Sequence, residues 1–243
     1  MKDYLQDLID HTLTLGCVDL IKVNGSSTET LISAIAEDKS VIIQGKFKAP
    51  ITDFDGVFGM PNLSKLKIIL GFDDYNEKSK VSVTKTQRDG VDVPSTIHFE
   101  TESGDFVNDY RLMSKAIIEE KIKTVNFKGA TWNVEFEPTI AGILRLKKQA
   151  NANSEETNFT VKTDKGDLKV YFGDPSTHSG NFVFQPQVTG TLGRAWMWPV
   201  KQFISIMDLT GDKVVRISDQ GVAQVTVDSG IADYTYLLPA QSK

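Results

Sequence analysis

The sequence predicts an α+β protein made of two similar domains. Four segments place apolar residues at helical spacing, and most of the remaining chain alternates like strand. Each predicted helix is followed by three short predicted strands, so one unit of a helix and three strands occurs four times. Helix starts at residues 3 and 62 in the first half recur at 138 and 199 in the second. The simplest account is two copies of one plan, each with two helices packed on antiparallel sheets.

The two helices of the first half are defined by their apolar stripes and end signals. Leu5, Leu8 and Ile9 lie on one face of the first helix. The second helix follows Pro61-Asn62 and ends at Gly71, a residue that stops helices. The four predicted helices cover residues 3–16, 62–71, 138–150 and 199–210.

The two helices of the second half each open at a proline, which fits the first turn because its missing N–H would have no partner there. Pro138 opens one and Pro199 opens the other, which Gly211 ends. The apolar face of the third helix is predicted to be led by Ile140, Ile143 and Leu144.

The predicted strands are short and are separated by turn residues. Lys165-Gly166 and Gln220-Gly221 are typical of tight hairpins, as is Asp89-Gly90. Residues 56–59 are interpreted as a turn that leads into the second helix, in preference to a weak anion-binding loop. The predicted strands are 20–23, 28–36, 40–47, 80–86, 95–100, 106–113, 157–163, 168–172, 181–188, 213–218, 222–227 and 234–238.

Composition excludes several classes of function. The formal net charge of −5 argues, as a chain average, against a conventional nucleic-acid binder. Cys17 is the only cysteine, and the three histidines lie far apart, so neither a disulfide nor a metal site is expected. No apolar run approaches the roughly 20 residues that span a bilayer, and the N-terminus does not resemble a signal peptide.

The sequence carries no strong catalytic signature. No phosphate-binding loop, nucleophile elbow or dinucleotide fingerprint is present. Asp53 with Asp55, and Asp73 with Asp74, are candidate carboxylate pairs, but both lie in polar turn sequence where solvated carboxylates are ordinary. The sequence therefore predicts a protein that is not an enzyme and uses no cofactor.

Two repeated domains of this plan resemble the DNA sliding clamps, the processivity factors of DNA polymerases. The run 110–113 (YRLM) ends the first half before an extended connector, and 131–137 leads as a strand into a helix. The ending 236–240 (YLLPA) is similar to the C-terminal strand of the eukaryotic clamp. The stretch 53–56 (DFDG) before the second helix, with the short chain, resembles clamps of T-even tailed bacteriophages.

The resemblance implies a fold and a function. It implies a clamp domain at 1–113, an interdomain connector at 114–130 and a second clamp domain at 131–243. Three subunits would close head to tail into a pseudo-sixfold homotrimeric ring around duplex DNA, with the helices lining the hole. The ring would tether the replicative DNA polymerase, would be opened by an ATP-dependent clamp loader, and would work in the cytoplasm of the infected host cell.

The charges on the predicted helices fit that function, because a ring lining that tolerates DNA should be basic. Three helices expose bases and carry no acid before the last turn. The first helix departs from this pattern, with Asp3, Asp7 and Asp10 beside Lys2 and His11 on its expected exposed face. The predicted DNA-facing residues are Lys65, Lys67, Arg145, Lys147, Lys148 and Lys201.

Ring closure and partner binding imply two further sets of residues. The edge strands 106–113 and 181–188 would pair across subunits in a heterologous contact. Their predicted interface residues are Phe106, Tyr110, Leu112, Phe182 and Phe184. Clamp partners insert a short peptide into an apolar pocket near the connector and C-terminus. Its predicted residues are Val125, Phe127, Tyr236, Leu238 and Pro239, although each would also serve as a core residue.

Two other functions stay open from the sequence. One is a phage β-rich structural protein, such as a ring-forming virion component, which would not need basic helix faces. The other is a hydrolase that uses a carboxylate pair, which the absence of a histidine or metal motif disfavours.

Overall fold

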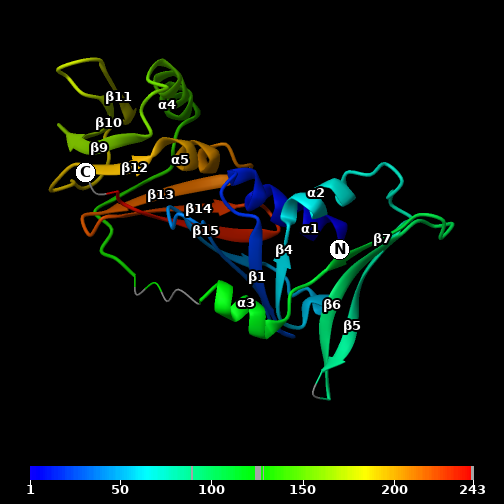
Figure 1. The fold of residues 1–243 in the computed structure, drawn as a ribbon. Helices are drawn as coiled ribbons and strands as arrows, with labels where there is room; N and C mark the ends of the chain where they lie inside the picture. The colour runs from blue at the N-terminus through cyan, green and yellow to red at the C-terminus, as the bar shows by residue number, and fades with distance from the viewer. Residues whose placement is uncertain (89, 124–126, 128, 242–243) are drawn as a thin grey trace. The chain divides into compact units, whose positions relative to one another are not determined.

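The computed structural model describes residues 1–88, 90–123, 127 and 129–241, and the chain divides into two compact units (Figure 1). The first unit holds Met1–Glu37, Ile43–Val125 and Ser229–Tyr234. The second holds Asp38–Ile42, Asn126–Asp228 and Thr235–Lys243. The predicted boundaries at 113 and 130 stay a prediction, and each unit is described by itself below.

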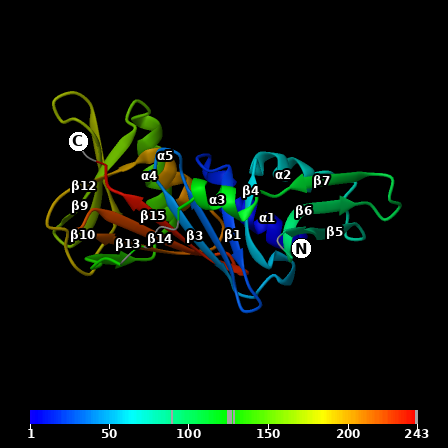
Figure 2. The same cartoon turned by 60° about the horizontal axis from the view of Figure 1, so that its bottom comes forward.

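The first unit contains two antiparallel sheet segments with helices. One segment has the strand order β4-β1-β2-β3, and the other has the order β5-β6-β7, with β6 in the middle (Figure 2). The elements are α1 (Lys2–His11), β1 (Leu20–Gly25), β2 (Thr30–Ile35), β3 (Ile42–Phe47), β4 (Gly56–Pro61), α2 (Leu63–Leu70), β5 (Lys80–Arg88), β6 (Val91–Glu100), β7 (Val107–Arg111) and α3 (Lys115–Lys121), with 3-10 turns at Leu13–Leu15 and Thr52–Phe54.

The described part of the second unit also combines helices with two antiparallel sheet segments. Its strands run in the orders β11-β10-β9-β12 and β15-β14-β13-β8. The elements are β8 (Val134–Phe136), α4 (Ile140–Ala152), β9 (Asn158–Asp164), β10 (Asp167–Gly173), β11 (Ser179–Gln185), β12 (Trp196–Pro199), α5 (Val200–Met207), β13 (Asp212–Ser218), β14 (Val222–Asp228) and β15 (Ala232–Pro239).

The apolar stripe of the first predicted helix is confirmed, but the helix is shorter than predicted. Leu5, Leu8 and Ile9 of α1 are fully buried. The helix ends at His11, because the backbone of Thr12 turns out of the helical region, and the Thr12 hydroxyl donates to the carbonyl of Leu8, 2.6 Å away. A short 3-10 turn follows and stops at Gly16, whose φ of 71° suits glycine.

Two strands and one helix were not predicted. Residues 56–59, interpreted as a turn, belong to β4, which pairs with β1 along its whole length. The β4 residues Phe58 and Met60 are buried, whereas Gly56 and Gly59 gave the segment the composition of a turn. β12 pairs with β9 and ends at Pro199, which was predicted to be the first residue of the helix over 199–210. Part of the expected extended connector is the helix α3.

Gly142 sets the distance between α4 and the edge strand β11. A Cβ atom at this position would lie 2.5 Å from the backbone oxygen of Phe184 on β11, closer than atoms can approach. Alanine has the higher helix propensity, by about 1 kcal/mol. The obstructing oxygen of Phe184 belongs to the backbone and cannot move aside as a side chain could. Glycine therefore fits at position 142 better than alanine, despite its lower helix propensity.

Gly142→Ala should therefore destabilise the protein. We expect a loss of about 1–3 kcal/mol in the free energy of unfolding, the usual cost of overpacking, measured by urea denaturation. Ser64→Ala, at an exposed position of α2, is the control and should change stability little. A Gly142→Ala protein as stable as the original chain would show that α4 can move away from β11 at no cost.

Candidate functional site

The two predicted DNA-facing lysines of α2 are exposed. Lys65 and Lys67 flank Leu66, which is fully buried together with Leu63 against the sheet. The outermost position of this helix is not basic, however, because Ile68 lies there with 62% of its surface exposed. The two ammonium groups are therefore accessible on either side of an apolar residue.

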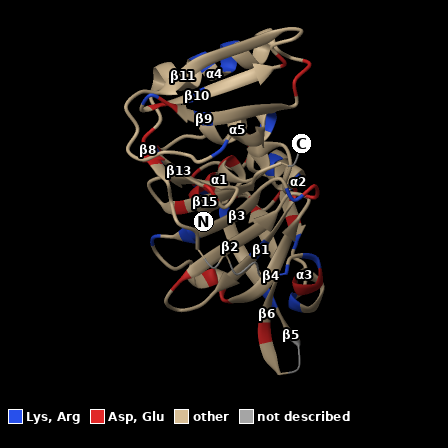
Figure 3. Cartoon of the chain, turned by 90° about the vertical axis from the view of Figure 1, so that its left-hand side faces the viewer, with Lys and Arg blue, Asp and Glu red and all other residues tan. Residues whose placement is uncertain are grey.

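The bases of α4 are not equivalent. The helix is capped by the Thr139 hydroxyl, which accepts a hydrogen bond from the Gly142 N–H at 3.0 Å. Arg145 and Lys148 are exposed, and Figure 3 shows blue residues on this helix. Lys147 differs from them because its ammonium forms an ion pair with the carboxylate of Asp208, which caps the end of α5. Its charge is therefore already balanced within the unit.

The apolar face predicted for α4 is wrong. Ile140 is 79% exposed and Leu144 is 51% exposed, while Gly142 and Leu146 face the sheet. The close approach at Gly142 turns the helix so that its small residue points inward and two of its large apolar residues point to solvent. On α5, Phe203, Ile206 and Met207 are buried and Lys201 is exposed.

The acidic exposed face expected on α1 is smaller than its sequence suggested. Asp7 accepts a hydrogen bond from the Tyr234 hydroxyl at 2.8 Å, and His11 is buried and stacked on the Tyr234 ring at 4.7 Å. Both residues thus hold α1 to the start of β15 inside the first unit. Asp3 and Asp10 remain exposed.

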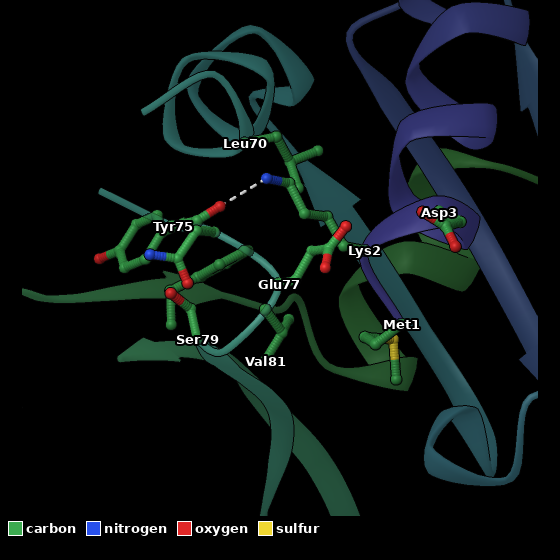
Figure 4. A pocket seen from close by; sticks show the side chains of 10 residues that line it. Met1, Lys2, Asp3, Leu70, Tyr75, Glu77, Ser79 and Val81 are labelled. Carbon is green, nitrogen blue, oxygen red and sulfur yellow. Dashed lines mark hydrogen bonds between the residues drawn. The ribbon is translucent and has the colours of Figure 1, made fainter. Parts of the chain in front are cut away.

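A hollow of about 570 Å³ lies beside the start of α1 (Figure 4). Leu70, Tyr75 and Phe99 are buried residues that contribute to its wall. The Lys2 ammonium donates to the carbonyl oxygen of Tyr75 at 2.6 Å. Lys2 is therefore held by the chain itself, unlike the exposed lysines of α2. The hollow leaves no local signal in the sequence, because its lining comes from separate segments between residues 1 and 99.

The two strands predicted to form ring contacts lie at sheet edges. β7 is an end strand of its three-stranded sheet and β11 is an end strand of its four-stranded sheet. The Thr101 N–H donates to Phe106 O at 3.1 Å, and the Leu112 N–H donates to Ser95 O at 2.9 Å. Because hydrogen bonding alternates along an antiparallel pair, the backbone groups of Val107, Asp109 and Arg111 point away from the sheet.

The five predicted interface side chains have different exposures. Phe106 is 37% exposed and its ring contacts Phe72 and Tyr75 within the first unit. Leu112 and Phe182 are half-buried. Tyr110 and Phe184 are buried core residues. The interface role of the set stays a prediction, and the structure makes the outward backbone of β7 the more accessible feature.

Tyr110 is a buried residue whose hydroxyl donates a hydrogen bond to the carbonyl oxygen of Pro61. Burial, with a smaller contribution from the Asp19 carboxylate, raises the pKa of Tyr110 above its usual range. A raised pKa means that this contribution to stability is complete below the unfolded pKa of about 10 and is lost as the pH rises beyond it.

Tyr110→Phe is expected to lower the free energy of unfolding by about 1 kcal/mol at neutral pH. The difference in free energy of unfolding between the two proteins should narrow above about pH 10. Ionisation of Tyr110 stabilises the unfolded state of the original chain there, and the Phe variant has no such group to ionise. Urea denaturation at a series of pH values measures both effects. A gap that stays constant up to pH 11 would contradict the assignment of the high-pH loss to Tyr110.

The predicted peptide pocket is only partly accessible. Phe127 is 37% exposed and its ring lies 6.1 Å from that of Trp132, and Pro239 is exposed. Tyr236 and Leu238 are fully buried, and the Leu238 carbonyl accepts a hydrogen bond from the Trp198 indole at 3.0 Å. These two residues therefore form core under the site instead of its surface. Val125 lies outside the described residues.

Comparison with solved structures identifies the architecture. The chain aligns over 100% of its length with 96% of the PCNA chain in a structure of the C-terminal region of FEN-1 bound to A. fulgidus PCNA, at 12% identity and a TM-score of 0.69. It aligns over 99% of its length with 97% of PCNA from Thermococcus kodakaraensis, at 11% identity and a TM-score of 0.68. The chain has the sliding-clamp fold. No protein-family model and no curated protein sequence matches it.

The clamp fold confirms the predicted α+β architecture with helices on antiparallel sheets. Both neighbours are archaeal, and the predicted likeness to the T-even phage type in particular has no support from them. Within the described part of the clamp-fold chain, no helix combines the length and apolar character needed to cross a bilayer.

Proposed function

We propose that this chain is a sliding clamp that encircles duplex DNA and tethers a DNA polymerase. The alignment of nearly the whole chain with two PCNA structures carries the proposal. Two independent features support it. Each unit has an edge strand available for a neighbour, and helices in both units expose Lys or Arg while the chain as a whole is acidic.

The proposed assembly is a homotrimeric ring in which β7 of one subunit pairs with β11 of the next. Such a contact is heterologous, so it closes only if the rotation between subunits brings the last edge back to the first. Lys65, Lys67, Arg145, Lys148 and Lys201 are proposed to face the DNA. Lys147 is a weaker candidate than the others because Asp208 already balances its charge.

The proposed mechanism is topological. A ring that surrounds DNA needs no tight contact, because dissociation requires the ring to open. The exposed bases attract the phosphates of any sequence, and the acidic remainder of the surface disfavours DNA elsewhere. The polymerase gains processivity from its attachment to the ring, and an ATP-dependent loader opens it. We place this activity in a phage-infected host cell, where replication takes place.

The decisive experiment asks whether DNA is held by topology. The protein is diluted until it dissociates and is then concentrated with either nicked circular or linear duplex DNA at about 0.5 M salt, where electrostatic contacts are weak. We expect the mass of three 26.9 kDa chains, retention on circles and loss from linear DNA. A strict monomer at tens of micromolar, or equal retention on both DNAs, would overturn the proposal.

We also propose a docking site for partner peptides around Phe127 and Pro239. The support is the partial exposure of an aromatic ring beside Trp132 and of the proline that ends β15. The C-terminal segment after Pro239 is held against β12, because the Gln241 N–H donates to Met197 O at 2.9 Å. A partly exposed aromatic ring suits an apolar peptide side chain.

Phe127→Ala should weaken binding of the polymerase without changing the ring. Loss of a central aromatic contact costs 2 kcal/mol or more at a typical hot spot, which is a rise in Kd of about thirtyfold. Surface plasmon resonance with the cognate polymerase measures it, and Val91→Ala, at an exposed position in the other unit, is the control. Equal affinities of the two variants for the polymerase would show that Phe127 is not part of the docking site.

A further inference from the structure

Three exposed apolar side chains occupy the outermost positions of helices that also carry the exposed bases. We call them the crest residues: Ile68 on α2, and Ile140 and Leu144 on α4. Their exposures are 62%, 79% and 51%. Single apolar residues at a surface are ordinary, but Ile140 and Leu144 are four positions apart and so form a continuous patch along one side of α4.

Helix geometry shows that the crest faces away from each sheet. Leu144 and Leu146 are two positions apart, which separates them by about 160° around α4, and Leu146 is fully buried. Ile68 and the fully buried Leu66 have the same relation on α2. The crest residues therefore project from the side of each helix opposite to its core contact.

That direction does not suit the proposed contact between subunits. A strand that pairs with β11 approaches in the plane of the sheet. α4 is held to β11 at Gly142, so its crest points out of that plane. Basic side chains flank the crest on both helices, with Lys148 one turn beyond Leu144 and Lys65 close to Ile68. The neighbouring charge fits a polyanion and not another apolar surface.

We propose that the crest residues face the duplex and act as a non-adhesive lining that keeps the ring mobile. This inference rests on the proposed clamp function. An apolar side chain cannot hold a phosphate oxygen, whereas a lysine at the same place releases counterions and steepens the slope of log affinity against log salt by about 0.9 per contact. Bases beside the crest centre the DNA, and the apolar crest limits how many phosphates are held at once.

The test compares two variants that add the same charge. Ile140→Lys with Leu144→Lys changes the crest, and Val91→Lys with Ile117→Lys changes exposed apolar residues outside α2 and α4. Labelled rings are followed on stretched duplex DNA at 50 and 200 mM salt. Between 200 and 50 mM salt, each added phosphate contact strengthens DNA binding by roughly three- to fourfold. We therefore expect the crest variant to slow by about that factor per contact when the salt is lowered, relative to the original protein. The control variant should slide like the original protein.

Further measurements distinguish a failure of the crest proposal from a failure of the proposed clamp function. Ile140→Ala with Leu144→Ala should keep both the ring mass and the original sliding rate, since neither alanine binds phosphate. A ring that falls apart in either crest variant would assign these residues to a subunit contact and overturn the proposal. Equal sliding of the crest and control variants would also overturn it while leaving the clamp function intact. An original protein that is not retained on circular DNA would remove the clamp function and this inference together.

Discussion

Reversing Lys65, Arg145, Lys148 and Lys201 to Glu is expected to impair loading onto circular DNA and to leave the ring assembled. All four side chains are exposed on α2, α4 or α5, so the reversals disturb no core contact. Each subunit would lose four phosphate contacts and gain four repulsive charges. Because each phosphate contact contributes a separate counterion-release term, the loss in DNA association should exceed about two orders of magnitude at moderate salt.

The matched control reverses Lys80, Lys85, Lys115 and Lys121, which are exposed on β5 and α3. It gives the same net charge, so a general repulsion from DNA would affect both variants equally. We expect the control to load onto circular DNA almost like the original chain. Equal loss in the two variants, with ring mass unchanged, would show that the helices do not face the duplex in particular.

The sequence predicted those helices and hairpins whose signal lies within a short stretch of the chain. The stripe of Leu5, Leu8 and Ile9 specified α1, and Lys165-Gly166 closes the pairing of β9 with β10 as expected. β4 and β12 were missed because glycine or proline punctuates them, although they are held by pairing with distant strands. Long-range pairing of this kind leaves no periodic signal in a short window.

Positions in the candidate site were harder to predict than elements. The charge of Lys147 is balanced by Asp208, which lies 61 positions along the chain. Asp7 and His11 were assigned to an exposed face and instead contact Tyr234, near the other end of the sequence. Exposed Leu144 follows from the contact at Gly142, where a single absent Cβ decides which face of α4 is buried. Each error has the same cause, a tertiary contact that overrides a local pattern.

The edge strand β7 offers a sharp test of ring closure, because fold and assembly depend on different sides of its backbone. The N–H of Asp109 points away from β6, so replacing it with proline removes no hydrogen bond within the sheet. In the proposed ring, the same N–H would donate to the neighbouring subunit. Asp109→Pro is therefore expected to leave a folded chain that no longer closes.

The expected effect is large because a ring of three subunits contains the contact three times. At about 1 kcal/mol for each lost hydrogen bond, three contacts amount to about 3 kcal/mol, which lowers the association constant of the trimer on the order of a hundredfold. Because that constant depends on the square of the subunit concentration, the concentration at which rings dissociate rises on the order of tenfold. The steric bulk of the proline ring would add to this penalty. Mass measured across a dilution series gives the shift, and thermal unfolding checks that the fold is kept.

Asp109→Ala is the control, because the Asp109 carboxylate also lies 2.8 Å from Nδ1 of His98. The alanine variant loses this side-chain contact but keeps the backbone N–H, so its rings should dissociate at nearly the original concentration. If both variants weaken the ring equally, the side chain and not the strand edge makes the contact. If Asp109→Pro is folded and its rings are as stable as those of the original chain, β7 does not pair with a neighbouring subunit, and ring closure must use another surface.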